Sequence, residues 1–108
     1  FLAPTFVDAG RESSYHLYML RIANATEAQR DAIISAIAKR EVSVNVHFIP
    51  MPMLTVYKNL GYRIADFPNV YKQYSREISL PVYFDLSDAQ VDEVIAAVKD
   101  SVGEVMGA

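Results

Sequence analysis

Two segments of the chain combine a helix start signal with apolar residues at helical spacing. Residues 26–29, TEAQ, and residues 87–90, SDAQ, both place a hydroxyl residue three positions before a glutamine, which is the spacing of a capping box. We therefore expect one helix over residues 27–40 and a second one behind SDAQ, which Gly103 and Gly107 end. The apolar positions predict one buried stripe on each helix: Ile33, Ile34, Ile37 and Ala38, then Val91, Val94, Ile95, Val98 and Val102. The opposite side of the first helix is polar, with Arg30, Asp31, Ser35 and Lys39.

Three other segments have the pattern of β-strands. Residues 15–22, YHLYMLRI, form an aromatic and aliphatic run that is typical of a strand covered on both faces. Residues 77–84, EISLPVYF, form another extended run, in which Pro81 limits pairing and predicts a short or edge strand. Residues 42–49, VSVNVHFI, alternate, so that one face holds Val42, Val44, Val46 and Phe48 and the other holds Ser43, Asn45 and His47.

Shorter elements fill the interval between the second and the third of these strands. Thr55 to Leu60 predict a short helix that Gly61 ends, and Asp66 with Pro68 predicts the start of another. The resulting order is β-α-β-(α)-α-β-α. It predicts an α+β two-layer sandwich, a small, mostly antiparallel, three-stranded sheet covered by helices on one face.

The same pattern divides the chain into three parts. Residues 1–14 are expected to form an irregular lead-in from a preceding domain, residues 15–102 the small domain itself, and residues 103–108 a frayed tail. The opening FLAPTFVDAG lacks an initiator methionine and is apolar at once, which favours a piece of a longer polypeptide.

The composition restricts the class of function. A length of 108 residues fits one domain, and a net charge of −3 provides no basic field for nucleic acid. The chain has no cysteine, which excludes disulfides and thiol catalysis, and its two histidines have no carboxylate at metal-ligand spacing. It has neither an apolar run long enough to span a membrane nor a signal-peptide pattern, so a cytoplasmic location is expected.

The strongest candidate for part of a site is the stretch VHFIPMPMLTVYK, residues 46–58. The strand end places His47 on a polar face, and Pro50 and Pro52 favour extended backbone that displays the side chains around them. Met51 fits either irregular core packing or the wall of a ligand pocket. The residues alone leave both interpretations open.

Three further residues accompany this stretch. His16 begins the first strand, where it either bonds to backbone or points into a cleft, and Tyr57 and Lys58 either lie in solvent or contact a ring or a phosphate. A Schiff-base lysine needs a desolvated or electropositive pocket. Lys58 is the only lysine near the loop, and nothing nearby could hold a cofactor ring, so the chain is expected to be catalytically incomplete alone.

Three segments in this order resemble one known family, the DegT/StrS family of sugar aminotransferases. They are SSYHLYMLRI, VHFIPMPMLTVYKNLGY and YSREISLPVYFDLSDAQVDEVIAAV. The resemblance is to the C-terminal small domain and covers about residues 13–102. It implies the aspartate-aminotransferase fold type, in which a large domain outside this chain holds pyridoxal phosphate and the lysine that binds it.

The resemblance also implies roles for single residues. His47, Phe48 and Pro50 match the family segment that faces the substrate. Tyr57 and Lys58 match an aromatic–basic pair that follows this segment, and His16 matches a histidine in a strand. With one methionine of the same loop, the substrate-facing candidates are His47, Phe48, Pro50, Met51, Tyr57, Lys58 and His16. No catalytic, cofactor-binding or metal-binding residue is expected in this chain. Many members have a second histidine where this chain has Pro52, which implies a more apolar wall there.

For the whole protein, the resemblance implies transfer of an amino group, usually from glutamate, to a keto sugar nucleotide. The expected product serves surface polysaccharide or related amino-sugar biosynthesis, although some relatives dehydrate instead. The expected partners are the missing pyridoxal-phosphate-binding domain of the same polypeptide and a second copy in a homodimer. The alternative is a free-standing α+β module that binds a small ligand or a partner chain.

Overall fold

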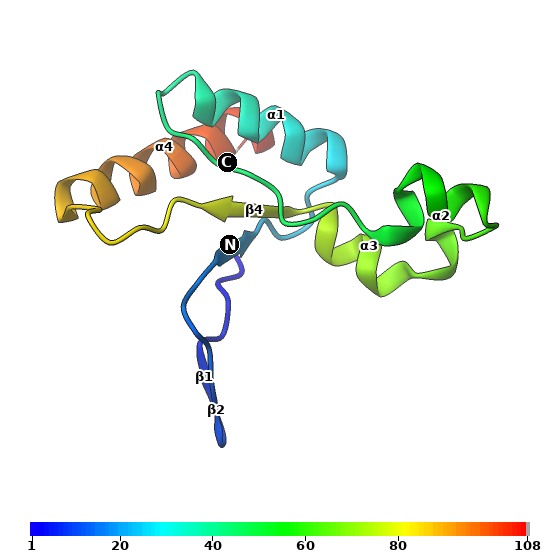
Figure 1. The fold of residues 1–108 in the computed structure, drawn as a ribbon. Helices are drawn as coiled ribbons and strands as arrows, with labels where there is room; N and C mark the ends of the chain where they lie inside the picture. Colours follow the sequence, from blue (N-terminus) through cyan, green and yellow to red (C-terminus); the bar gives the residue numbers. More distant parts are fainter. Residues whose placement is uncertain (108) are drawn as a thin grey trace.

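The computed structural model describes residues 1–107, and its centre is an antiparallel pair of strands (Figure 1). β3 (Tyr18–Arg21) pairs with β4 (Glu77–Leu80) along the full length of both. Both strands are shorter than predicted. β3 starts late because Tyr15 has a φ of 59°, outside the extended region, and β4 stops before Pro81, which has no backbone donor.

Two helices lie on one face of this sheet (Figure 1). α1 (Glu27–Ala38) and α4 (Asp88–Met106) each begin at a complete capping box, as the sequence predicts. The hydroxyls of Thr26 and Ser87 each accept the backbone N–H of the glutamine three residues on, at 3.2 Å. In return, each of these glutamines accepts the backbone N–H of the capping residue at 2.9 Å. The starts of both helices are therefore set locally.

The end of α4 differs from the prediction. The helix continues past Gly103 to Met106 and ends at Gly107, whose φ of 74° is left-handed. Residues 103–106 are therefore helical and not part of a frayed tail, because Val105 and Met106 still pack against the core. Within residues 1–107, none of the helices combines the length and the apolar content that crossing a membrane requires.

The core lies between the β3–β4 sheet and the two helices. The predicted stripe of α1 is confirmed at Ile33 and Ile37, which are completely buried. The predicted stripe of α4 is confirmed at Val98, which is 4% exposed, but it is wrong at Ile95, which is 49% exposed. The buried residues pack against the inward face of the sheet in one cluster: Leu20, Ile22, Ala25, Ile33, Ile37, Ile78, Val98 and Val102. Because side chains alternate along a strand, the neighbours of Leu20 and Ile78 project to the opposite face.

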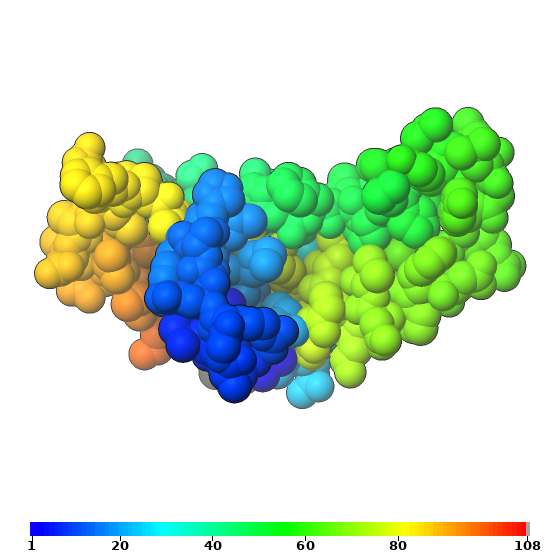
Figure 2. All heavy atoms as spheres, turned by 60° about the horizontal axis from the view of Figure 1, so that its bottom comes forward, coloured from blue at the N-terminus to red at the C-terminus, as the bar shows by residue number. Residues whose placement is uncertain are grey.

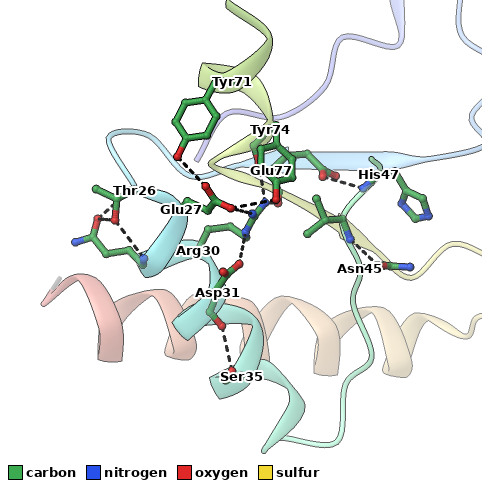
Figure 3. Close-up of polar contacts among 12 residues, drawn as sticks. Thr26, Glu27, Arg30, Asp31, Ser35, Asn45, His47, Tyr71, Tyr74 and Glu77 are labelled. Carbon is green, nitrogen blue, oxygen red and sulfur yellow. Dashed lines mark hydrogen bonds and ion pairs between the residues drawn. The ribbon is translucent and has the colours of Figure 1, made fainter. Parts of the chain in front are cut away.

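Arg30 contradicts the predicted polar side of α1, since it is only 1% exposed (Figure 3). Its Nη1 donates to the backbone carbonyls of Tyr74, at 2.7 Å, and Glu77, at 3.2 Å. Its Nε donates to Asp31 at 2.7 Å, and its guanidinium carbon lies 4.7 Å from the centre of the Tyr74 ring. Arg30 therefore ties α1 to the chain segment that leads into β4.

The predicted third strand, residues 42–49, is reduced to one bridge to β4. Asn45 and Ser79 exchange two backbone hydrogen bonds, of 3.1 and 2.7 Å. The next hydrogen-bonded pair in an antiparallel ladder would join His47 to Glu77. However, the Glu77 carbonyl accepts from Arg30, and the His47 N–H donates to the Glu77 carboxylate instead. The sheet is therefore two-stranded with a bridge, although the predicted α+β class is confirmed.

The segment before β3 is not fully irregular. Residues 7–12 form a hairpin, in which β1 (Val7–Asp8) pairs antiparallel with β2 (Arg11–Glu12). The tight turn needs a positive φ, which Gly10 supplies at 75°. The hairpin projects away from the β3–β4 sheet, on the side opposite α1 and α4 (Figure 1).

Four short helical segments form a lobe at one end of the sheet (Figure 1). α2 (Thr55–Asn59) ends before Gly61, whose φ of 97° confirms the predicted stop. α3 (Pro68–Tyr74) begins at a proline, also as predicted. Two 3₁₀ turns, Met51–Met53 and Ile64–Asp66, complete the lobe.

The lobe is held against α1 through one carboxylate (Figure 3). Glu27 accepts the hydroxyl of Tyr71 at 2.7 Å and that of Tyr74 at 3.1 Å. The hydrogen bond to Glu27 raises the pKa of Tyr71, and burial followed by the same carboxylate raises the pKa of Tyr74. Both hydroxyls must therefore stay protonated to donate to Glu27.

Truncation of the core should separate buried from exposed isoleucines. We expect Ile37→Ala to lower the free energy of unfolding by about 2–5 kcal/mol, because it leaves a cavity between α1 and the sheet. The matched change Ile95→Ala, at a side chain that is 49% exposed, should cost about 0.5 kcal/mol or less. Urea unfolding of both variants measures the difference, and equal losses would contradict the described core.

The tyrosine pair predicts a loss of stability at high pH. Both tyrosines have a pKa above the ordinary value of 10.0 in the folded chain. The unfolded chain therefore releases these protons first, and the free energy of unfolding falls as pH rises above about 10. The double variant Tyr71→Phe/Tyr74→Phe should show a smaller fall than wild type in unfolding curves recorded between pH 8 and 11. A matched Tyr83→Phe variant should keep the wild-type slope; an unchanged slope in the double variant would refute the assignment.

Candidate functional site

The face of the sheet that α1 and α4 leave free carries a cavity of about 620 Å³. β3 contributes Met19 and Arg21, which alternate with the buried Leu20, and β4 contributes Glu77. The other walls come from α3, the loop at residues 47–50 and the N-terminal segment. Figure 2 shows this face, with the N-terminal segment in blue on one side and the α2–α3 lobe in green on the other.

His47 lies in the part of the cavity wall that the loop at residues 47–50 forms. Its backbone N–H donates to Oε2 of Glu77 at 3.1 Å, and its ring meets the Phe48 ring edge to face, with centres 4.8 Å apart. The peptide bond between the two residues is cis. Nδ1 of His47 is buried and has no hydrogen-bond partner among the described residues. A polar atom in that state points to a partner that residues 1–107 do not supply.

A second cavity, of about 300 Å³, lies on the other side of His47. It brings together the two histidines of the chain, since His16 also lines it, with Asn45 and Ser79 between them in the wall. His16 is exposed and lies before β3 rather than within a strand. His47 borders both cavities, whereas His16 lines only the smaller one.

The remaining candidates lie in the lobe. Met51 and Tyr57 line a third cavity of about 400 Å³, with Tyr62 and Phe67. Lys58 is exposed and lines none of the three cavities. The structure therefore gathers His47, Phe48 and Pro50 at the cavity of about 620 Å³ and places the other predicted residues elsewhere.

Sequence reasoning missed the charged residues of the main cavity. Arg21 and Glu77 are directly opposite each other in the β3–β4 register, yet they form no ion pair within residues 1–107. Arg21 donates to Oε1 of Gln73, and the Glu77 carboxylate binds His47 and Ser79. The available signal was a glutamate at the first position of a strand whose other residues carry no charge, because a charged residue is rarely buried.

The residues of this chain do not suit pyridoxal phosphate by themselves. All four lysines are exposed, namely Lys39, Lys58, Lys72 and Lys99, whereas a Schiff-base lysine needs a desolvated setting. Within the described part of the chain, no group of three histidine or acidic side chains could hold a metal ion. We therefore assign no step of a reaction through either group to these residues.

Fold and site together define a small α+β domain, with helices on one sheet face and an apolar, charge-containing wall on the other. The chain belongs to the DegT/DnrJ/EryC1/StrS aminotransferase family, whose sequence profile matches residues 2–99. This confirms the family resemblance of the three ordered segments.

Individual relatives match almost the whole chain. The spore coat polysaccharide biosynthesis protein SpsC of Bacillus subtilis (strain 168) is 39% identical over 104 residues, which are 94% of this chain and 26% of that protein. The structure of "putative sugar aminotransferase Spr1654" from Streptococcus pneumoniae, apo-form, is 41% identical with a TM-score of 0.86, over 89% of this chain and 24% of that one. Spr1654 also has PLP-form and PMP-form structures among the matches.

A more distant structure gives the same picture. Helicobacter pylori PseC, an aminotransferase involved in the biosynthesis of pseudoaminic acid, is 25% identical with a TM-score of 0.78, over 86% of this chain and 25% of that one. The chain therefore spans about a quarter of the length of the relatives it matches.

The described geometry predicts that Phe48 contributes little to stability. Its side chain is 74% exposed, so Phe48→Ala should change the free energy of unfolding by about 0.5 kcal/mol or less. Tyr74→Ala, which removes a half-buried ring beside Arg30, should cost about 2 kcal/mol or more. Thermal unfolding of both variants shows whether the Phe48 side chain packs against the rest of the chain or faces outward. A large loss for Phe48→Ala would favour packing.

Proposed function

We propose that this chain is the C-terminal small domain of a pyridoxal-phosphate-dependent aminotransferase that acts on a keto sugar nucleotide. The observation that carries the proposal is the family match over residues 2–99 in a chain that spans about a quarter of its relatives. Names of these relatives refer to sugar aminotransferases and polysaccharide biosynthesis. The proposed product is an amino sugar for a surface polysaccharide or a related glycoside.

In this proposal the domain closes one side of the active site and does not perform the chemistry. Pyridoxal phosphate supplies the electron sink when it is bound in the longer polypeptide. The loop residues His47, Phe48 and Pro50 provide shape and exclude water at the sugar side. The position of all three residues in the wall of the cavity of about 620 Å³ supports this placement.

The exposed apolar residues support docking against a further domain. Phe48 is 74% exposed and is followed in sequence by the exposed Ile49, and the fully exposed Phe84 follows the exposed Val82 and Tyr83. Exposed apolar groups of this kind mark an interaction surface. We propose that the large domain of the same polypeptide covers this surface and supplies the Schiff-base lysine.

The remaining features belong to the same proposal. Pro52, where many family members have a histidine, makes this part of the wall apolar beside Met51. We expect glutamate as the amino donor and a homodimer as the working form. The expected compartment is the cytoplasm.

A second candidate is a free-standing module that binds a small ligand. The cavity of about 620 Å³ favours it, because residues of this chain alone form the walls. Light scattering separates the two candidates. An independent module stays at one size as its concentration rises, whereas a domain with an uncovered apolar face associates with itself.

The proposal predicts the behaviour of the longest polypeptide that contains this chain. The segment before Phe1 should contain a lysine whose replacement abolishes pyridoxal absorbance, and the purified protein should transfer an amino group from glutamate to a keto sugar nucleotide. Phe48→Ala should raise KM for the sugar about tenfold, because losing one aromatic contact costs about 1.4 kcal/mol. The control Ile95→Ala, on the far helix face, should keep the wild-type KM. The absence of any pyridoxal-binding domain upstream would refute the proposal.

A further inference from the structure

We propose that Glu77 is the positioning residue that holds His47 and Phe48 in place along the wall of the candidate site. This inference rests on the proposed function for its catalytic consequence and on the described contacts for its structural content. Glu77 lies in β4, 30 residues after His47, and no part of the family resemblance singled it out.

The carboxylate of Glu77 is buried and fully engaged. Glu77 is 5% exposed and projects to the sheet face opposite Ile78, into the wall of the main cavity. Oε2 accepts the backbone N–H of His47 at 3.1 Å (Figure 3). Oε1 accepts the hydroxyl of Ser79. The contact with His47 restrains the loop, whereas Ser79 lies two residues along the same strand and holds the carboxylate in place.

The His47 N–H donates to this carboxylate at the place where a regular ladder would use a backbone carbonyl. Continuation of the bridge between Asn45 and Ser79 would offer it the backbone carbonyl of Glu77. That carbonyl accepts Nη1 of Arg30 at 3.2 Å instead. A buried N–H without an acceptor is costly, so the side chain of the same residue satisfies it. Glu77 thus replaces a rung of the sheet with a side-chain contact.

The contact between Glu77 and His47 also sets the course of the loop behind it. The chain departs from β4 at this contact, and Phe48 becomes 74% exposed instead of continuing the predicted inward face. The Phe48 ring stays against the imidazole, and the imidazole separates the two neighbouring cavities. One hydrogen bond therefore sets the direction of both side chains.

Three substitutions distinguish this role from a general contribution to folding. Glu77→Gln keeps the length of the side chain, so its amide oxygen can accept the His47 N–H while its nitrogen donates to Ser79. Glu77→Asp is shorter by about 1.5 Å, one carbon–carbon bond, which takes a 3.1 Å contact out of hydrogen-bond range. Glu77→Ala removes the acceptor. Glu93→Gln, on the exposed side of α4, is the matched control.

The first readout is hydrogen exchange at the His47 amide, measured by mass spectrometry in the longest polypeptide that contains this chain. In Glu77→Asp and Glu77→Ala the exchange should accelerate about tenfold or more, the effect of losing a hydrogen bond to a charged group. Glu77→Gln and Glu93→Gln should stay within about threefold of wild type. Amides of α1 and α4 should be unchanged in all four variants.

The second readout separates the two substrates. Glu77→Asp should raise KM for the keto sugar nucleotide about tenfold, whereas the half-reaction with glutamate keeps its wild-type rate. Glu77→Gln should restore the KM to near the wild-type value. A wild-type protein without aminotransferase activity would defeat the proposed function, while the exchange measurement would still test Glu77.

Three results would overturn the inference itself. They are unchanged His47 exchange in Glu77→Ala, equal acceleration in Glu77→Gln and Glu77→Asp, and loss of protection in α1 and α4 together with His47. The last would make Glu77 a residue of general stability rather than of position.

Discussion

The burial of the Arg30 guanidinium is the interaction on which the rest of the arrangement depends. A buried cation is stable only where it is paired and hydrogen-bonded, and here Asp31, two backbone carbonyls and the Tyr74 ring meet that requirement. These partners belong to α1, to the end of α3 and to the start of β4. The helix layer, the lobe and the sheet therefore meet at one side chain.

The third strand stops beside the Arg30 contacts. Nη1 of Arg30 donates to the Glu77 carbonyl, which is the carbonyl that a second rung of the ladder would also use. The His47 N–H then binds the carboxylate of the same glutamate, and the chain turns away from the sheet. The wall of the candidate site is thus the outcome of an interrupted strand, and its position relative to the sheet is set from the opposite, helical layer.

The parts of the fold that sequence could predict are those determined within a few residues. Both capping boxes are four-residue patterns, and Gly61 ends its helix through its own φ. The third strand has a good local alternation, but it stops at the contacts among Arg30, Glu77 and His47, and Arg30 and Glu77 lie 47 residues apart in sequence. Periodicity predicted a polar, exposed position for Arg30. It shows on which side of the helix a residue lies, but it cannot show which groups from other elements will bind and bury a charged side chain there. The misplacement of Phe48 results from the same long-range contact.

The candidate site divides in a similar way. His47, Phe48 and Pro50 are adjacent in sequence, so one loop brings all three to the main cavity. Lys58 is only eight positions beyond Pro50, but the intervening 3₁₀ turn and α2 carry it to the exposed side of the lobe. Arg21 and Glu77 were not predicted, because a charge reaches a site through the register of two strands distant in sequence. The wall of this cavity is apolar where the loop forms it and charged where the sheet forms it. The apolar part suits contact with a surface that loses its water on binding, and the part with Arg21 and Glu77 suits binding and orienting a polar group.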